Sequence, residues 1–122
     1  MARVLVADDA SFMRQMIREI VEAEGHEVVG EASDGDEVVE EFKRLQPDIV
    51  TMDIVMPRRS GIDAVKSIVA LDSSAQVVMC SALGQETLVQ EAIEAGAQDF
   101  IVKPFKPDAV IATLQKVIEK SE

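Results

Sequence analysis

Short apolar runs alternate with segments of helical periodicity five times along the chain. The apolar runs are Val4–Ala7, Glu27–Ala32, Ile49–Met52, Val77–Cys80 and Phe100–Val102. Most are continuous rather than alternating, which is typical of strands buried on both faces of a sheet. The segments between them repeat hydrophobic residues at spacings of three and four, as Met13, Met16, Ile17, Ile20 and Val21 do, and so predict amphipathic helices.

Five strand–helix units predict an α/β fold, a doubly wound (βα)5 parallel sheet of five strands with right-handed crossovers. Helix-end signals agree with this reading. Asp34 is a candidate N-cap, Gly25 and Gly96 are stop signals, and Pro107 suits the first turn of the last helix. We expect a single domain over residues 1–122, because no linker or low-complexity stretch occurs and the sequence ends just after the fifth helix.

Composition narrows the classes of partner. The net charge is −11 and the pI about 4.4, so the surface repels nucleic acid and anionic membranes. The apolar runs are far shorter than a membrane span. The single cysteine, Cys80, cannot form an internal disulfide, which favours a reducing cytoplasm.

Charged and hydroxyl side chains follow the predicted strands. Asp8 and Asp9 follow the first strand and Asp53 follows the third, and carboxyl ends of parallel strands are where such folds bind ligands. Clustered carboxylates repel one another unless a cation neutralises them, and oxygen ligands of this kind suit Mg²⁺. Ser81 and Lys103, at the ends of the fourth and fifth strands, add the hydroxyl and the cation that would bind a phosphoryl group.

Four strings carry a resemblance to a known family. They are Val4–Asp9, Met52–Pro57 with Gly61, Cys80–Ala82 and Phe100–Phe105. Together and in this order they resemble the receiver domain of two-component response regulators, over essentially the whole chain. The stretches Asp8–Arg14 and Gly96–Phe105 resemble the single-domain chemotaxis regulators, the CheY-like subgroup. The resemblance implies the flavodoxin-like strand order 2-1-3-4-5.

The resemblance also implies a site and a reaction. Asp53 would accept a phosphoryl group from a phosphohistidine of a sensor histidine kinase, in a Mg²⁺-dependent step. The metal ligands would be Asp53, Asp9 directly, Asp8 largely through water, and the backbone carbonyl of Val55. The protein would be a phosphoacceptor that assists its own phosphotransfer and dephosphorylation rather than an enzyme acting on other substrates.

In the same resemblance, Lys103, the Ser81 hydroxyl and the Ala82 backbone N–H contact the phosphoryl group, and Lys103–Pro104 is a cis peptide bond. Ser81 and Phe100 form the switch. The output surface would be the fourth helix, fifth strand and fifth helix, through which a monomer binds a downstream motility or switch protein.

Several side chains are expected to influence partners. In the resembled family, the side chains at the positions of Val55 and Leu83 tune dephosphorylation. Neither side chain here can hydrogen-bond an attacking water, so the resemblance implies a long-lived phosphoryl group and a dedicated phosphatase. The glutamates of the fourth helix predict a partner with a basic surface: Glu86, Glu91 and Glu94. Arg58 and Arg59 are expected to place positive charge beside the pocket.

Simpler interpretations stay open at this point. Asp53 could cap the following turn, Asp8 or Asp9 could cap the first helix, and Phe100 could be a core residue. The chain could be a receiver domain cut from a larger regulator, or an inactive receiver that serves only for docking. A phosphohydrolase of the haloacid-dehalogenase type would need a second aspartate where Val55 stands.

Overall fold

The computed structural model describes residues 1–121, with side chains to Lys120. Within this range five strands alternate with five helices. The strands are β1 (Arg3–Ala7), β2 (Glu27–Ala32), β3 (Ile49–Asp53), β4 (Gln76–Ser81) and β5 (Asp99–Val102). The helices are α1 (Ser11–Ala23), α2 (Gly35–Leu45), α3 (Gly61–Leu71), α4 (Glu86–Ala95) and α5 (Pro107–Ser121). The predicted alternation of elements is confirmed.

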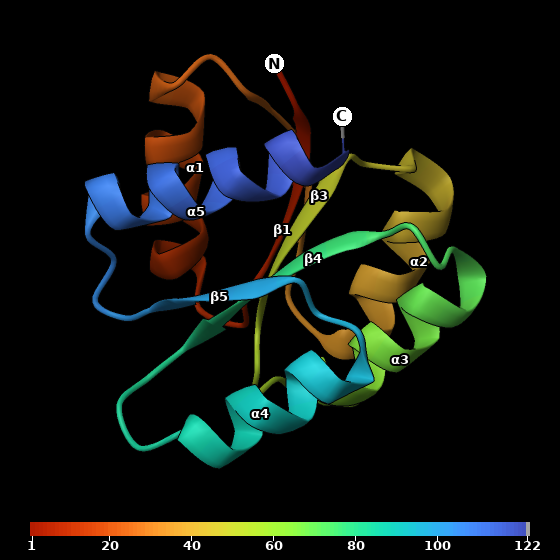
Figure 1. Cartoon of the computed structure of the whole chain (residues 1–122). Helices are drawn as coiled ribbons and strands as arrows, with labels where there is room; N and C mark the ends of the chain where they lie inside the picture. The colour runs from red at the N-terminus through yellow and green to blue at the C-terminus, as the bar shows by residue number, and fades with distance from the viewer. Residues whose placement is uncertain (122) are drawn as a thin grey trace.

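All five strands are parallel and lie in the order β2-β1-β3-β4-β5, as expected. Helices α1 and α5 cover one face of the sheet, and α2, α3 and α4 cover the other (Figure 1). Each face has its own hydrophobic core, in which Val4, Val6, Val50 and Met52 are no more than 1% exposed. Burial on both faces explains why the strand sequences are continuous apolar runs.

The helix ends follow the sequence signals. The Asp34 carboxylate caps α2 by accepting a hydrogen bond of 2.8 Å from the Glu37 N–H. Gly25 and Gly96 follow α1 and α4 with φ of 85° and 125°, and α5 begins at Pro107. These left-handed positions favour glycine, which has no Cβ to clash with the backbone.

Register brings the strand ends to one edge of the sheet. Ala7 of β1 lies opposite Met52, Asp53 of β3 lies opposite Cys80, and Ser81 of β4 lies opposite Val102. The residues that follow these strands therefore meet, although they lie far apart in the sequence.

Gly61 fixes the connection from β3 to α3. Its N–H donates to the Ile54 carbonyl at 2.7 Å, and a Cβ placed there would overlap the Asp53 carbonyl oxygen and Ile54. Only glycine allows α3 to start this close to the end of β3. The backbone that follows Asp53 is thus held by packing.

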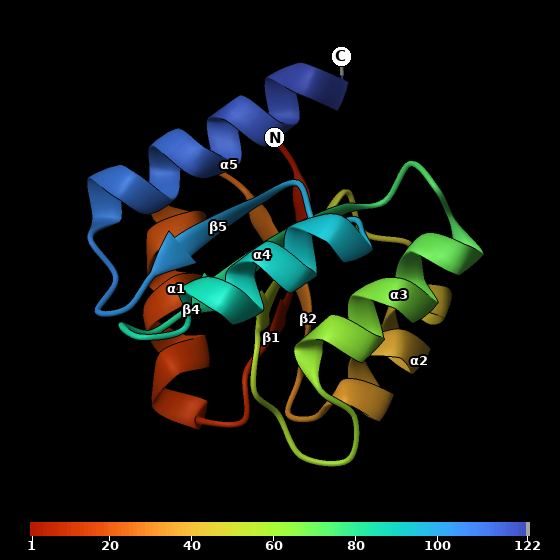
Figure 2. The ribbon, with the colours of Figure 1, turned by 60° about the horizontal axis from the view of Figure 1, so that its bottom comes forward.

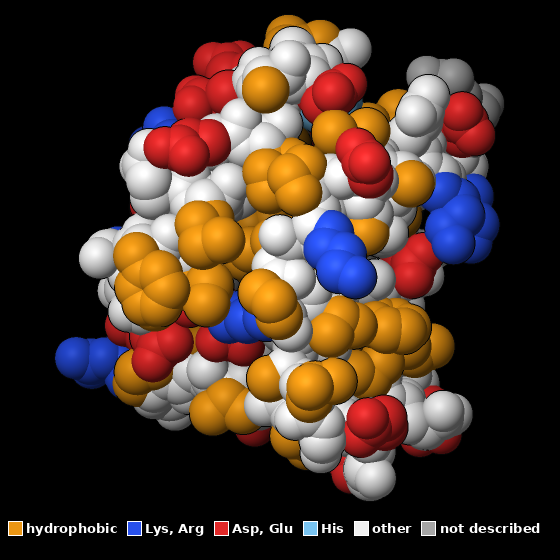
Figure 3. Space-filling view, turned by 90° about the vertical axis from the view of Figure 1, so that its left-hand side faces the viewer, with side chains coloured by type: hydrophobic (Ala, Val, Ile, Leu, Met, Phe, Trp, Pro, Cys, Tyr) orange, Lys and Arg blue, Asp and Glu red, His pale blue; other side chains and the backbone are white. Residues whose placement is uncertain are grey.

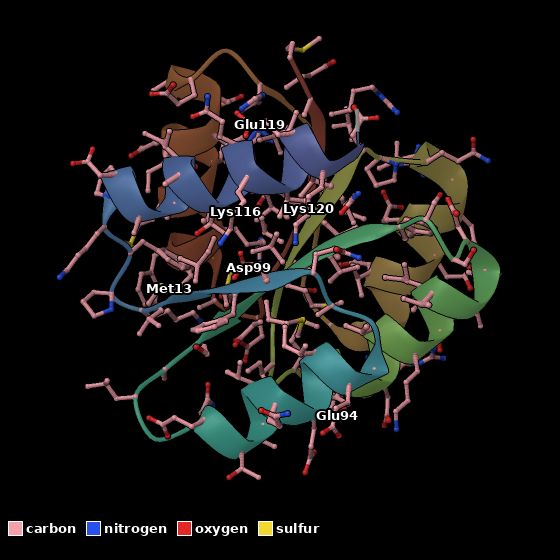
Figure 4. All side chains as sticks on the ribbon, viewed as in Figure 1. Met13, Glu94, Asp99, Lys116, Glu119 and Lys120 are labelled. Atoms are coloured by element: carbon pink, nitrogen blue, oxygen red, sulfur yellow. The ribbon has the colours of Figure 1, made fainter. Side chains whose placement is uncertain are left out.

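Strand β5 forms one edge of the sheet, between α4 and α5 (Figure 2). Lys116 of α5 pairs with Asp99 at the start of β5, at 3.0 Å (Figure 4). No helix within residues 1–121 is long and apolar enough to cross a membrane.

Candidate functional site

Three carboxylates gather at the ends of β1 and β3. Oxygens of Asp8, Asp9 and Asp53 all lie within 4.8 Å of one another. Asp8 and Asp53 are buried, whereas Asp9 is exposed to solvent. A set of hard oxygen donors with one solvent-facing member suits Mg²⁺, which keeps several waters when it binds protein. The residues present therefore fit the expected metal.

Neither Asp8 nor Asp9 caps α1 with its side chain. The N-cap of α1 is Ala10, and it has no side-chain capping bond. Asp8 instead accepts a hydrogen bond of 2.9 Å from the Ala10 N–H. The interpretation of Asp8 or Asp9 as a helix cap is wrong, because the chain turns between them and α1, and this turn leaves Asp9 free to face the cluster.

Lys103 offsets part of the negative charge of the cluster. Its Nζ lies 2.9 Å from an oxygen of Asp8 and 3.3 Å from an oxygen of Asp53. Burial by itself lowers the pKa of Lys103, but the hydrogen bond to Asp8 and the charge of Asp53 outweigh it, so the pKa lies above its usual value. The ammonium therefore stays charged between the two buried carboxylates. The Lys103–Pro104 peptide bond is cis, as expected.

Asp53 is held in an environment that disfavours its charge. Burial raises the pKa of Asp53, Lys103 opposes this shift, and the neighbouring charges of Asp8 and Asp9 add to it. A carboxylate in this position gains from any cation that enters the cluster. The turn-cap interpretation of Asp53 does not account for this convergence of charges.

The two expected hydrogen-bond donors at the end of β4, Ser81 and Ala82, have acceptors within the protein. The Ser81 hydroxyl lies 3.5 Å from the Ile101 carbonyl oxygen, and the Ala82 N–H donates to Oε1 of Gln85 at 2.7 Å. Ser81 is buried and Ala82 is exposed. Ser81 is the last residue of β4 and Ala82 is the first residue after it, so both donors lie at the same end of the sheet as the carboxylate cluster.

Phe100 is not a core residue, because 42% of it is exposed. It lines a hollow of about 420 Å³ between α4 and β5, together with Leu83, Val89, Ile93 and Val102. Figure 3 views the end of the molecule that carries the β4–α4 and β5–α5 connections, where hydrophobic side chains gather at the surface. Phe100 therefore has room to change its position without disrupting the core.

Sequence reasoning missed Arg14. Its guanidinium donates to the Asp8 carbonyl oxygen at 2.6 Å, and its Nε pairs with Glu31 of β2 at 2.8 Å. The signal in the sequence was weak: a cation one helical turn into the segment that follows Asp8 and Asp9. Arg14 thereby ties the start of the acidic pair to two other elements.

The paired arginines of the β3–α3 connection carry less free charge than expected. Arg58 pairs with Asp34 at 3.3 Å, and Arg59 pairs with Asp36 at 3.0 Å. Arg59 also donates to the Ser67 hydroxyl at 2.8 Å. The positive charge expected beside the pocket is thus compensated at the start of α2.

The profile of the response regulator receiver domain matches residues 4–115. The chain belongs to this family. It is 56% identical to the chemotaxis protein CheY of Thermotoga maritima, over 94% of this chain and 96% of that protein. As a receiver domain it is a signalling regulator, homologous to a chemotaxis response regulator of a two-component system. The phosphohydrolase interpretation is not favoured.

Solved structures agree with this assignment. The CheX-CheY-BeF3-Mg²⁺ complex of Borrelia burgdorferi contains a chain that aligns with a TM-score of 0.91 and 38% identity, over 95% of this chain and 88% of that chain. NtrX of Brucella abortus aligns with a TM-score of 0.91 and 32% identity over 98% of this chain. The match spans only 28% of NtrX, so the likeness there is to one part of a longer protein.

Proposed function

We propose that Asp53 accepts a phosphoryl group from a phosphohistidine of a sensor histidine kinase and that this changes the output surface of the protein. The observation that carries the proposal is the position of Lys103, whose Nζ lies within 3.3 Å of both Asp8 and Asp53. Lys103 opposes the rise in the pKa of Asp53 that burial causes, and it supplies a cation for the transferred group.

In the transfer, a carboxylate oxygen of Asp53 attacks phosphorus. The new P–O bond forms as the P–N bond to the imidazole breaks, and the imidazole nitrogen keeps the electron pair of that bond. Lys103 then balances the charge of the phosphoryl oxygens, and the Ser81 hydroxyl and Ala82 N–H donate to them.

Mg²⁺ would be held by Asp8, Asp9, Asp53 and the Val55 carbonyl, and when bound it neutralises charge on the transferred group. The Borrelia burgdorferi relative was solved with beryllofluoride and Mg²⁺, which supports a Mg²⁺ site in this chain. The closeness of the three carboxylates, whose oxygens lie within 4.8 Å of one another, supports the same assignment.

The switch would couple Ser81 to Phe100. When Ser81 turns toward the phosphoryl group, Phe100 moves toward the hollow beside it, and the surface of α4, β5 and α5 changes. The shift selects a conformation already accessible to the protein rather than a new fold. We infer that a downstream motility or switch protein reads this surface, and that the regulator acts as a cytoplasmic monomer.

The charge of α4 suits a basic partner. Its three glutamates are all exposed: Glu86, Glu91 and Glu94. Glu94 projects from the helix away from the sheet in Figure 4. Complementary charge would mainly increase the rate of association, and the effect would fade with salt.

A phosphatase is the third partner. The side chains of Val55 and Leu83 are 57% and 84% exposed, and neither can orient a water toward the acyl phosphate. A partner would supply the polar group that these positions lack.

The test is to incubate the protein with acetyl phosphate and Mg²⁺ and to map the modified residue by mass spectrometry. Label is expected on Asp53, with none on an Asp53→Asn variant. Asp63→Asn is the matched control, because Asp63 is an exposed aspartate at the start of α3 and should leave labelling unchanged. Stable label on the Asp53→Asn variant contradicts the proposal.

A further inference from the structure

In the β4–α4 connection, Ala82–Gln85, the side chain of the last residue bonds the backbone of the first. Gln85 directly precedes α4, yet its side chain does not cap that helix. Instead its Oε1 accepts the hydrogen bond from the Ala82 N–H, at 2.7 Å. The Gln85 carbonyl meanwhile accepts from the Val89 N–H, which anchors the residue to the first turn of α4.

This bond occupies a donor that the proposed function needs. The inference rests on that function, in which the Ala82 N–H donates to a phosphoryl oxygen on Asp53. A backbone N–H has one hydrogen and makes one well-aligned bond at a time. A phosphoryl oxygen must therefore displace the Gln85 side chain before it can gain this contact.

We propose that Gln85 is a positioning residue that keeps the switch in its resting state. Its amide oxygen holds the Ala82 N–H until the phosphoryl group takes it over. Exchange of the neutral acceptor for a charged one favours the phosphorylated state, because hydrogen bonds to ionised acceptors are stronger.

The rest of the connection offers little resistance to this exchange. Leu83 is 84% exposed, and a Cβ on Gly84 would meet nothing within 4 Å. Gly84 itself has a φ of 87°, a conformation that glycine adopts without strain. Once Gln85 releases Ala82, residues 82–85 can follow Ala82 toward Asp53 without breaking core contacts.

The neighbouring donor, the Ser81 hydroxyl, makes a weaker internal hydrogen bond than the Ala82 N–H does. The Ser81 hydroxyl lies 3.5 Å from the Ile101 carbonyl, which is at the limit of a hydrogen bond. The shorter bond to Gln85 is therefore the stronger of the two internal contacts that compete with a phosphoryl group. This places the control of the switch at the start of α4 rather than within β4.

A different role for Gln85 predicts the opposite sign. If Gln85 prepared the Ala82 N–H for the phosphoryl group, its removal would weaken binding of a phosphoryl analogue. If it competes for that N–H, its removal strengthens binding. One net hydrogen bond corresponds to a change of about threefold to tenfold.

The experiment is a titration of the full chain with beryllofluoride and Mg²⁺, followed by NMR. Gln85→Ala should bind beryllofluoride about threefold to tenfold more tightly than the parent. In the free protein, the Ala82 amide resonance should move in the same variant. Gln85→Glu, whose carboxylate is a stronger acceptor, should bind more weakly than the parent.

Gln90 provides matched controls, because it lies on the same helix and its side chain bonds only Glu94 among the described hydrogen bonds. Gln90→Ala should leave the affinity unchanged. Gln90→Glu adds a negative charge to the same helix and loses the bond to Glu94, without touching Ala82. Gln85→Glu must therefore weaken binding by more than this control.

Equal affinity in the Gln85→Ala and Gln90→Ala variants, or weaker binding in Gln85→Ala, overturns the proposed role of Gln85. The proposal that Asp53 is the phosphoacceptor is unaffected by either result. If the parent binds no beryllofluoride at the Asp53 cluster, the proposed function fails, and the proposed role of Gln85 fails with it. The two failures are thus distinguished by the parent protein alone.

Discussion

The end of the sheet where the carboxyl ends of the strands meet has two halves, and they are stabilised in different ways. In the half formed by the ends of β1 and β3, Asp8 and Asp53 are 4% and 8% exposed, and Gly61 packs directly against the strand end. In the half formed by β4, β5 and their connections, Leu83 is 84% exposed and Phe100 is 42% exposed. The first half is fixed by close packing and the second by a few hydrogen bonds.

Under the proposed function, this difference separates phosphoryl transfer from the change of the output surface. Phosphoryl transfer depends on the placement of charges, so the half that would hold the metal and the phosphoacceptor gains from rigidity. A conformational change costs least where few buried contacts must break, and that is the half next to Phe100. One small domain can therefore react at one side of an edge and change shape at the other.

Exchange of one glycine in each half tests the comparison most directly. Gly61→Ala should lower the free energy of unfolding by about 3 kcal/mol or more, because its Cβ would overlap the backbone of Asp53 and Ile54. Gly84→Ala should cost only about 1–2 kcal/mol, since the strain is that of a left-handed backbone in open space. Urea denaturation measures both. Equal losses would mean that packing does not distinguish the two halves.

Removal of metal gives the next largest expected effect. Lys103 already offsets part of the charge of the cluster, so chelation should leave the circular dichroism spectrum intact. Mg²⁺ at ten times its Kd should raise the free energy of unfolding by roughly 1.4 kcal/mol. Calorimetry in Mg²⁺ and in EDTA checks this.

Two variants locate the effect of the metal. Asp9→Asn should lose most of the Mg²⁺-dependent increase, whereas Asp63→Asn should keep it, because Asp63 lies outside the cluster. Loss of helical signal on chelation, or a full increase in Asp9→Asn, contradicts the assignment of the metal to this cluster.

The fold was predictable because its signals are local and repeated. Continuous apolar runs identified the buried strands, and a parallel sheet brings their carboxyl ends to one edge, where Asp8, Asp53, Ser81 and Lys103 indeed meet. Glycine at positions 25, 84 and 96 coincides with positive φ. By contrast, Arg58 has a φ of 70°, and the conformational preferences of arginine do not predict this.

What could not be predicted depends on where long side chains turn. Arg14 reaches back to the Asp8 carbonyl, and Gln85 folds onto Ala82, through rotamers that packing selects and sequence spacing does not specify. The same limit applies to Arg58 and Arg59, whose partners on α2 are brought near by the tertiary fold.

The link between Arg14 and Asp8 tests whether the rigid half is held by more than glycine. Arg14→Gln should weaken Mg²⁺ binding about threefold to tenfold, because the Asp8 backbone loses a charged hydrogen-bond partner. Isothermal titration calorimetry measures this affinity. Arg14→Lys should recover only part of it, since lysine cannot contact Asp8 and Glu31 with a rigid fork.

Arg18→Gln is the matched control. Arg18 also pairs with Glu31, at 3.3 Å, but has no described bond to Asp8. Its loss should change thermal stability slightly and leave the Kd for Mg²⁺ unchanged. If both variants weaken Mg²⁺ binding equally, the ion-pair network and not the contact with Asp8 is responsible.

The smallest effect is expected at Arg58, and it decides whether surface charge contributes to the rigidity of the β3–α3 connection. The Arg58 side chain is 70% exposed, so its pair with Asp34 is screened by water and salt. Arg58→Ala should change the free energy of unfolding by less than about 0.5 kcal/mol, and the change should vanish in 1 M salt. Arg59→Ala should cost about 1 kcal/mol at either salt concentration, because Arg59 also donates to Ser67. A larger loss for Arg58→Ala that disappears in salt would show that charge holds this connection, and that the packing of Gly61 alone is insufficient.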